Sequence, residues 1–236
     1  MVVMPPVGIV TGASRGLGLA LAHALVERGW NIVIDARGED ALAAATESLR
    51  AAAGGGGPAV TAIPGDVADA QHRKQLVDAA GPRIDLLVNN ASLLGPSPQP
   101  PLADYPLAVL ERVYRVNVFA PLALAQLAIP RMPTNAAILN ITSDAGAEPY
   151  EGWGGYGSSK AALEQLSAIL AQEQPGKRVY AVDPGDMRTQ MQQEAFPGED
   201  ISDRPPPEES VPGLLALIEG ELPSGRYRAQ ELTVPR

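Results

Sequence analysis

Residues 7–29 read VGIVTGASRGLGLALAHALVERG, an apolar run followed by a glycine-rich turn and a helical pattern. Residues 7–11 are rich in β-branched side chains, which is typical of a buried strand. The glycines between Gly12 and Gly18 allow the backbone to turn tightly and approach a ligand, and the helix ends at Gly29. Because a helix N-terminus offers free N–H groups to phosphate, this unit predicts a pyrophosphate site. Its Gly-x3-Gly-x-Gly spacing differs from Gly-x-Gly-x-x-Gly, which leaves a plain tight turn as the alternative.

The second predicted strand, residues 30–36, ends where a doubly wound sheet usually contacts an adenosine ribose. An acid at this place favours NAD through the ribose 2′-hydroxyl, whereas an arginine favours the 2′-phosphate of NADP. Asp35 and Arg37 supply one of each, and Arg15 adds a second cation from the glycine turn. The sequence therefore favours NADP(H), with NAD(H) as the alternative. The alternative role for Arg37 is that of a solvated residue at a helix start.

Strands and helices continue to alternate along the chain without an internal repeat. Further strands are predicted at residues 59–63, 84–88, 136–142, 178–182 and 226–232. Helices are predicted at residues 39–53, 106–131, 156–174 and 208–220. This order predicts an α/β fold in which one doubly wound domain spans residues 1–236, with helices on both faces of a parallel sheet. Residues 186–208 show no periodicity and are expected to form a mobile substrate lid or, alternatively, a disordered surface loop.

The composition excludes several kinds of site and partner. The 236 residues contain no Cys, so disulfides and cysteine metal sites are ruled out, and no metal site is expected. A net charge of −9 argues against nucleic-acid and anionic-membrane partners. The N-terminus lacks the pattern of a signal peptide, and the apolar run at residues 118–129 is too short to span a bilayer. A soluble cytoplasmic protein is therefore expected.

A second stretch, residues 143–160 (SDAGAEPYEGWGGYGSSK), holds the candidate catalytic side chains. A phenol has an ordinary pKa of about 10, but a nearby cation lowers that pKa. Tyr156 and Lys160 are four residues apart and would share one helix face. Ser143 follows a predicted strand, where its hydroxyl could hydrogen-bond a substrate oxygen. The three side chains predict an acid/base device that interconverts a carbonyl and an alcohol, with a solvated helix face as the alternative.

Polar residues also follow the third and fourth predicted strands. Asp66 is either the N-cap of the next helix or a contact to adenine. Asn89 and Asn90 stand where ligands bind in doubly wound sheets, although Asn also favours turns.

Three further polar residues fall within predicted helices. Asn117 lies in mid-helix, where a buried amide needs a hydrogen-bond partner or a function. His23 is expected to be structural rather than catalytic, and His72 is expected to be exposed on its helix.

The order of these motifs resembles that of the short-chain dehydrogenase/reductase family over essentially the whole chain. Each motif is weak in isolation, but the ordered set is specific. The matching motifs are Thr11-Gly12-x3-Gly16-x-Gly18, Asp66-Val67, Asn89-Asn90-Ala91, Asn117, Ser143, Tyr156-x3-Lys160 and Pro184-Gly185-x3-Thr189. The resemblance implies a seven-stranded Rossmann-type fold, a nicotinamide cofactor and a homodimer or homotetramer. The broad apolar surface of the helix at residues 156–174 also suggests burial against a partner subunit.

The resemblance implies a role for each candidate catalytic residue. Tyr156 would be the general acid/base, and Lys160 would hydrogen-bond the nicotinamide ribose and lower the pKa of Tyr156. Ser143 would orient the substrate carbonyl, and Asn117 would hold a water in a proton relay that reaches Lys160. Ser92 departs from the family pattern, because it replaces the usual last residue of Asn-Asn-Ala-Gly and could crowd or re-aim that loop.

The resemblance also assigns residues to the parts of the cofactor. The glycines of the turn would line the pyrophosphate, and Asp66 and Val67 would flank adenine. Asn90 would lie against the adenosine-side ribose, and Thr189 would contact the carboxamide end. The expected cofactor-binding residues are Gly12, Ser14, Arg15, Gly16, Leu17, Gly18, Arg37, Asp66, Val67, Asn90, Ala91, Tyr156, Lys160, Pro184, Gly185 and Thr189.

The position that separates NAD from NADP users has a mixed pattern. Ala36 falls where NAD-preferring members often carry Asp, and Arg37 follows as in many NADP-preferring members, while Asp35 keeps NAD use open. We therefore expect an NADP(H)-dependent oxidoreductase that acts on a carbonyl or secondary alcohol. The rivals are an NAD-dependent member and a dinucleotide-binding sensor or scaffold without turnover. Candidates for the substrate pocket, chosen because they flank the motifs, are Leu93, Leu94, Glu148, Trp153, Met187, Met191 and Phe196.

Overall fold

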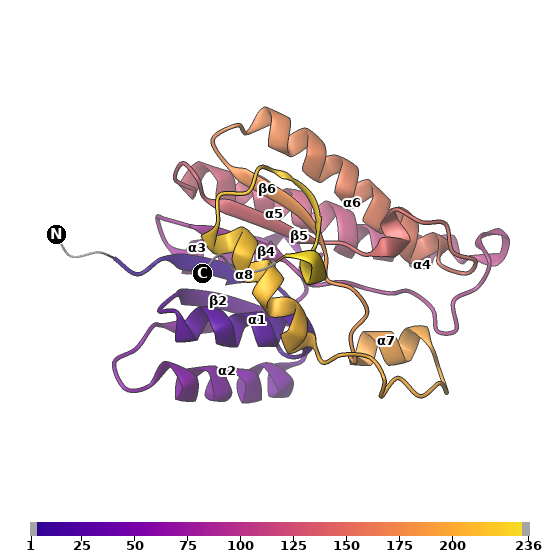
Figure 1. The fold of residues 1–236 in the computed structure, drawn as a ribbon, viewed down its shortest axis with the longest axis horizontal. Coiled ribbons are helices and arrows are strands. Elements are labelled where there is room, and N and C mark those ends of the chain that lie inside the picture. Colours follow the sequence, from indigo (N-terminus) through magenta and orange to yellow (C-terminus); the bar gives the residue numbers. More distant parts are fainter. Residues whose placement is uncertain (1–3, 233–236) are drawn as a thin grey trace.

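The computed structural model describes residues 4–232 and contains a seven-stranded sheet whose neighbouring strands are all parallel (Figure 1). The strands are β1 (Val7–Val10), β2 (Asn31–Ala36), β3 (Val60–Pro64), β4 (Leu86–Asn89), β5 (Ala137–Ile141), β6 (Arg178–Asp183) and β7 (Gly225–Arg228). Their order across the sheet is β3-β2-β1-β4-β5-β6-β7. The predicted parallel sheet of seven strands is confirmed.

Helices cover both faces of the sheet, as Figure 1 shows. They are α1 (Gly16–Glu27), α2 (Glu39–Ala53), α3 (Ala70–Ala80), α4 (Leu107–Tyr114), α5 (Ala120–Ala128), α6 (Gly154–Glu173), α7 (Gln190–Ala195) and α8 (Val211–Glu219). Short 3-10 turns lie at Leu102–Asp104, Asp144–Gly146 and Pro207–Ser210. Apolar side chains of α1, α2 and α8 form one core layer with the sheet. Those of α3 and α5 form the other layer, so the doubly wound arrangement is confirmed.

The centre of the sheet creates the crevice in which the site lies. Val10 of β1 pairs with Ile34 of β2 on one side and with Val88 of β4 on the other. From β1 the chain continues to β2 on one side of the sheet centre, and from β4 it continues to β5 on the other side. The loops after β1 and β4 therefore diverge at the carboxyl ends of these strands. Those loops are the glycine turn and the segment that begins at Asn90.

The predicted helix over residues 106–131 is helical throughout but is not one regular α-helix. A π-helical turn at Arg115–Phe119 separates α4 from α5, and a 3-10 turn at Ile129–Arg131 ends the stretch. A π-turn accommodates an extra residue within a helix and is frequent at functional sites. By length and composition Leu107–Arg131 could cross a membrane, but half of its apolar window is buried inside this fold. The same test is passed by core helices that pack against a sheet, as α5 does.

The predicted strand at residues 226–232 is shorter than expected. Pairing of β7 with β6 ends at Asp183 and Arg228, and a 3-10 turn follows at Ala229–Glu231. The next residue after β6 is Pro184, which has no N–H to continue the ladder. The expectation that no signal peptide is present involves residues 1–3, which lie outside the described residues.

Candidate active site

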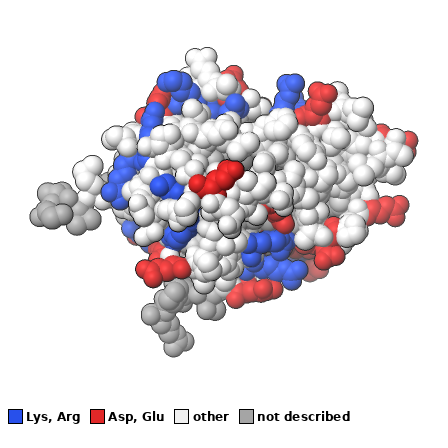
Figure 2. Space-filling model, turned by 90° about the horizontal axis from the view of Figure 1, so that it is seen from above, with Lys and Arg blue, Asp and Glu red and all other residues white. Residues whose placement is uncertain are grey.

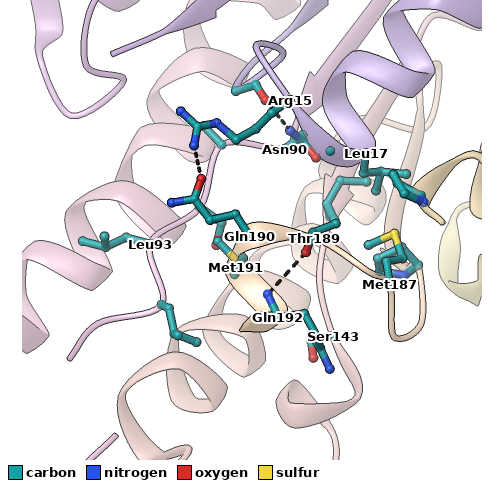
Figure 3. A pocket seen from close by; sticks show the side chains of 18 of the residues that line it. Arg15, Leu17, Asn90, Leu93, Ser143, Met187, Thr189, Gln190, Met191 and Gln192 are labelled. Carbon is teal, nitrogen blue, oxygen red and sulfur yellow. Dashed lines mark hydrogen bonds between the residues drawn. The ribbon is translucent and has the colours of Figure 1, made fainter. Parts of the chain in front are cut away.

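A cavity of about 690 Å³ opens at the carboxyl ends of β1 and β4 (Figure 3). It brings together most of the residues that the sequence predicted for cofactor and catalysis. The predicted residues that line it are Gly12, Ser14, Arg15, Gly16, Leu17, Arg37, Asp66, Val67, Asn90, Ala91, Ser143, Tyr156, Lys160, Pro184, Gly185 and Thr189. Gly18 and Asn117 lie behind the lining. Of the predicted substrate-pocket residues, Glu148 and Phe196 are also absent from it.

The glycine turn is held in shape by close packing against Asn90. Gly12 has φ +66°, and a Cβ there would lie 2.8 Å from the Cα of Ala91. A Cβ on Gly18 would lie 2.5 Å from Nδ2 of Asn90. That nitrogen donates to the carbonyls of Thr11 at 2.8 Å and Gly12 at 3.1 Å. The side-chain amide of Asn90 therefore braces the turn while the residue also lines the cavity. The ribose contact stays a prediction.

The start of α3 excludes the N-cap role for Asp66, and its contact to adenine stays a prediction. Asp69 is the N-cap, since its carboxylate accepts the N–H groups of Gln71 at 2.6 Å and His72 at 3.3 Å. Asp66 instead accepts the N–H of Ala68 at 2.9 Å and lines the cavity. The helix-cap interpretation of Asp66 was therefore wrong, because α3 begins at Ala70, three residues after the start that an N-cap at Asp66 would require.

Neither histidine lies where it could act on a substrate. The expectation that His72 is exposed was wrong, because its side chain is buried and its Nε2 lies 2.8 Å from Oδ2 of Asp35. His23 meets the hydroxyl of Ser48 at 3.0 Å, in agreement with a structural role. Asn89 is also structural, since its buried amide donates to Asn140.

The segment predicted as a lid lies against the glycine turn. Residues 190–195 form the short helix α7, which Thr189 caps by accepting the N–H of Gln192 at 3.3 Å. Arg15 of the turn donates to Oε1 of Gln190 at the start of α7 (Figure 3). The segment therefore lines the cavity and is attached to the glycine turn. Its mobility stays a prediction.

Tyr156 and Lys160 lie in the first two turns of α6, and both side chains are almost fully buried. Nζ of Lys160 lies 5.3 Å from the centroid of the Tyr156 ring. It donates to the carbonyl of Ile141, at the end of β5, over 2.8 Å. The predicted shared helix face is present, and the ammonium group is positioned by the sheet as well as by the helix.

Burial dominates the electrostatics of this pair. It raises the pKa of Tyr156 well above its ordinary value, and the charges of Asp183 and Asp144 act in the same direction, while the nearby hydroxyl of Ser92 lowers it. Burial also lowers the pKa of Lys160 to about 7, which the charge of Glu164 opposes. The sequence predicted a lowered pKa for Tyr156, but its pKa is raised, because desolvation of the phenol outweighs the effects of the neighbouring groups.

Asn117 has a hydrogen-bond partner for every polar atom of its side chain. Its Oδ1 accepts the N–H of Leu93 at 2.8 Å and the hydroxyl of Ser92 at 3.2 Å. Its Nδ2 donates to the carbonyl of Leu93 at 2.9 Å and to the hydroxyl of Ser159 at 2.9 Å. The side chain therefore ties the loop after β4 to α6. Its part in a proton relay stays a prediction.

Ser92 belongs to the site although the sequence suggested only that it could disturb the loop. Its hydroxyl donates to Asn117, it lines the cavity, and its position next to the phenol lowers the pKa of Tyr156. The signal that could have found it is the replacement of a family glycine by a residue with a hydroxyl.

Ser143 lines the cavity at the end of β5. Its hydroxyl donates to Oδ1 of Asp144 at 2.8 Å and accepts the N–H of Ala145 at 3.2 Å. The other carboxylate oxygen of Asp144 accepts the hydroxyl of Tyr150 at 3.1 Å. To accept a hydrogen bond from the Ser143 hydroxyl, a substrate carbonyl must therefore displace the carboxylate of Asp144, which accepts that hydrogen bond now.

The wall beyond Tyr156 is apolar. Tyr156 is buried with Leu94 and Ala145, and Met191 and Trp153 pack against this cluster. Trp153 meets the Tyr156 ring edge-on, with centroids 5.9 Å apart. Phe196 lies behind it, 5.8 Å from the ring of Trp153. Within residues 4–232, no cluster of side chains suited to a metal ion occurs.

Known proteins match both the sequence and the fold. The family profile described as short chain dehydrogenase matches residues 6–200. The rhamnolipids biosynthesis 3-oxoacyl-(acyl-carrier-protein) reductase of Pseudomonas aeruginosa is 36% identical over 197 residues, covering 78% of this chain and 74% of that protein. A solved structure from Pseudomonas syringae superimposes with a TM-score of 0.88 at 32% identity, covering 95% of this chain and 94% of that one. Another, from Shigella flexneri in complex with NADP, has a TM-score of 0.86 at 28% identity, covering 95% and 97%.

Proposed function

Because the chain belongs to the short-chain dehydrogenase family, we propose that it is an NADP(H)-dependent oxidoreductase that interconverts a carbonyl and an alcohol. The observation that carries the proposal is the placement of Tyr156, Lys160 and Ser143 in one cavity with the glycine turn. The buried phenol and ammonium groups lie beyond the turn that would hold the pyrophosphate. A dinucleotide that extends from this turn would therefore reach the catalytic side chains.

The side chains of this site would donate a proton to the substrate oxygen in reduction and remove it in oxidation. The bound nicotinamide would supply a hydride to the carbonyl carbon in reduction and accept one in oxidation. Tyr156 would give its phenolic proton to the carbonyl oxygen as the C=O π bond breaks, and would take it back in oxidation. Ser143 would donate a hydrogen bond to the same oxygen. A protonated Lys160 would stabilise the phenolate that remains.

The preference for NADP(H) is supported by the charges at the adenosine end of the cavity. Arg15 and Arg37 both line it with exposed side chains. Asp35, the acid that left NAD use possible in the sequence, is buried, and both of its carboxylate oxygens are hydrogen-bonded inside the protein. A solved relative from Shigella flexneri binds NADP.

The substrate end of the cavity supports an apolar carbonyl compound. Leu94, Trp153 and Met191 line the wall next to the Tyr156 ring. An aromatic or aliphatic group beside the reacting carbonyl would bury its surface against these side chains. The charge of Asp144 disfavours an anionic group close to the reacting carbon.

The test is oxidation of NADPH and of NADH with a panel of aryl ketones, aliphatic ketones, aldehydes and quinones. Tyr156→Phe should lower kcat by about 10²- to 10⁴-fold for any substrate turned over, while cofactor binding persists. Tyr114→Phe, which changes a tyrosine outside the cavity lining, is the matched control and should leave kcat unchanged. Wild-type activity in Tyr156→Phe would remove this residue as proton donor. Cofactor binding without turnover of any panel member would favour a sensor or scaffold.

Arg37→Ala tests the choice of cofactor. Removing the guanidinium should weaken NADPH binding by about tenfold, since a charge-assisted hydrogen bond contributes about 1.5 kcal/mol or more, and leave NADH binding unchanged. Equal NADPH affinity in the variant and the wild type would contradict the assignment of Arg37 to the 2′-phosphate.

A further inference from the structure

A buried contact between β2 and α3 lies directly beneath the glycine turn. Asp35 is 1% exposed, and its Oδ2 lies 2.8 Å from Nε2 of His72, which is 5% exposed. The other oxygen of the carboxylate accepts the N–H of Gly12 at 2.7 Å. The carboxylate is therefore enclosed between the first residue of the turn and an imidazole ring.

The position of Asp35 gives this enclosure a consequence for ligand binding. The residue stands near the end of β2, lines the cavity and is followed after one residue by Arg37. A carboxylate that turned from this position toward the cavity would accept a ribose 2′-hydroxyl and repel a 2′-phosphate. In the structure neither oxygen is available for that role.

The imidazole has little freedom to release the carboxylate. The backbone N–H of His72 donates to the carboxylate of Asp69, which caps α3. The ring packs against Gly65, where a Cβ would lie only 2.3 Å from Nδ1. Gly65 is itself attached to β2, because its N–H donates to the carbonyl of Ala36 at 3.0 Å. The backbone thus supports the ring from two sides.

We propose that His72 is a specificity-determining positioning residue for the cofactor. It keeps the charge of Asp35 beneath the glycine turn, so that the cations Arg37 and Arg15, and not this carboxylate, face the ribose. His72 touches no part of the ligand and acts through Asp35 alone. The inference rests on the proposed NADP(H)-dependent function and assigns its selectivity to a residue of α3.

The experiment compares dissociation constants for NADPH and NADH in the full chain, wild type beside His72→Leu. Leucine fills part of the ring volume but offers no hydrogen bond, so Asp35 is free to turn toward the cavity. The ratio of the NADPH constant to the NADH constant should rise by tenfold or more. Because both ligands bind the same folded molecules, a partly unfolded population cancels from this ratio.

Two further variants separate charge from shape. His72→Leu combined with Asp35→Asn should return the ratio to within about twofold of the wild-type value, because the neutral amide does not repel a phosphate. His72→Gln, whose amide can still donate to Asp35, should keep the ratio close to that of the wild type. Thermal unfolding of each variant verifies that a folded state is present.

Two results would overturn the role of His72. An equal loss of NADPH and NADH affinity in His72→Leu would show that the pair only braces the turn, and an unchanged ratio would show that Asp35 stays enclosed without it. A wild-type preference for NADH would instead overturn the proposed NADP(H) dependence. A ratio that still rose in His72→Leu would then uphold the role of His72, so the two failures are distinguishable.

Discussion

The ammonium group of Lys160 lies over the ring of Tyr156, 5.3 Å from its centroid, and donates to the Ile141 carbonyl. Both side chains are almost fully buried. Burial favours the neutral form of each, so the pKa of the lysine falls to about 7 and that of the phenol rises. The pair that is proposed to move a proton is thus also a source of pH-dependent stability.

We predict that the protein without added nucleotide becomes more stable as the pH rises from 7 to about 10. Below pH 7 Lys160 is charged in both states, and the cost of burying its charge is fully present. Above that pH the folded chain loses this proton, whereas the unfolded chain keeps it up to its ordinary pKa of 10.5. Unfolding then takes up a proton, and the free energy of unfolding rises by up to about 1.4 kcal/mol per pH unit.

Urea unfolding at pH 7, 8 and 9 measures this rise, with Lys160→Met as the control. The methionine keeps much of the apolar stem without a titratable group, so the slope with pH should disappear. The chain has no Cys that would titrate in this range. The same slope in Lys160→Met and the wild type would assign the effect to another group.

Ser92→Gly introduces the residue usual in this family and removes the hydroxyl that lowers the pKa of Tyr156. We expect the pKa seen in the pH profile of kcat for alcohol oxidation to rise by about half to one unit, the equivalent of one hydrogen bond. Ser92→Thr keeps a hydroxyl and should leave the profile unchanged. Identical profiles for Ser92→Gly and the wild type would mean that Ser92 does not influence the phenol.

Gly18→Ala should damage the cofactor site although Gly18 does not line the cavity. The new Cβ would lie 2.5 Å from Nδ2 of Asn90 and 2.6 Å from the carbonyl oxygen of Gly12, so the brace of the turn has to shift. NADPH binding should weaken at least about tenfold, with a lower Tm.

Gly38→Ala is the matched control, because its nearest neighbour would be the Cβ of Ala41 at 4.0 Å. Gly38 precedes α2, has a φ of −90° and lines the same cavity. The alanine at this N-cap should lower stability by about 0.5–1 kcal/mol, and it should weaken NADPH binding far less than Gly18→Ala does. Equal losses in Gly18→Ala and Gly38→Ala would contradict the assignment of the effect to the contact with Asn90.

Self-association through α6 is a fourth prediction. Ile169 on this helix is 43% exposed, and the side of the molecule on which α6 lies shows a broad area with few charged side chains (Figure 2). Light scattering at micromolar concentration should give the mass of a dimer or tetramer. Ile169→Glu should lower that mass, since a charge in an apolar interface is costly. Met4→Glu changes an exposed apolar residue outside α6 and should not lower it. A monomeric wild type would refute the prediction.

Much of the fold was readable from local patterns. The apolar run of β1, the glycine turn and the helix after it follow one another within 23 residues, and each leaves a signal in its own residues. Tyr156 and Lys160 were predicted to share a face, because four residues make about one turn of a helix. Alternation of such signals also predicted the parallel sheet.

Contacts between distant segments were not readable in this way. His72 was expected to be exposed on its helix, yet its ring nitrogen Nε2 lies 2.8 Å from the carboxylate of Asp35, 37 positions away in the chain. Asn90 braces a turn that lies 78 positions earlier in the chain. The pairing of β1 with β4 brings Asn90 to the turn, and the packing of α3 beside β2 brings His72 to Asp35. Both contacts exist only when the sheet and its helices are assembled.

The succession of strands and helices along the chain, the place of the glycine turn and the spacing of the catalytic side chains were therefore contained in the linear chain, because backbone geometry and apolar periodicity are local properties. Folding in three dimensions was needed to enclose Asp35, to attach Lys160 to the end of β5 and to raise the pKa of Tyr156. Those outcomes depend on which groups meet and on how much water is removed around them, and neither quantity exists before the sheet and its helices are assembled.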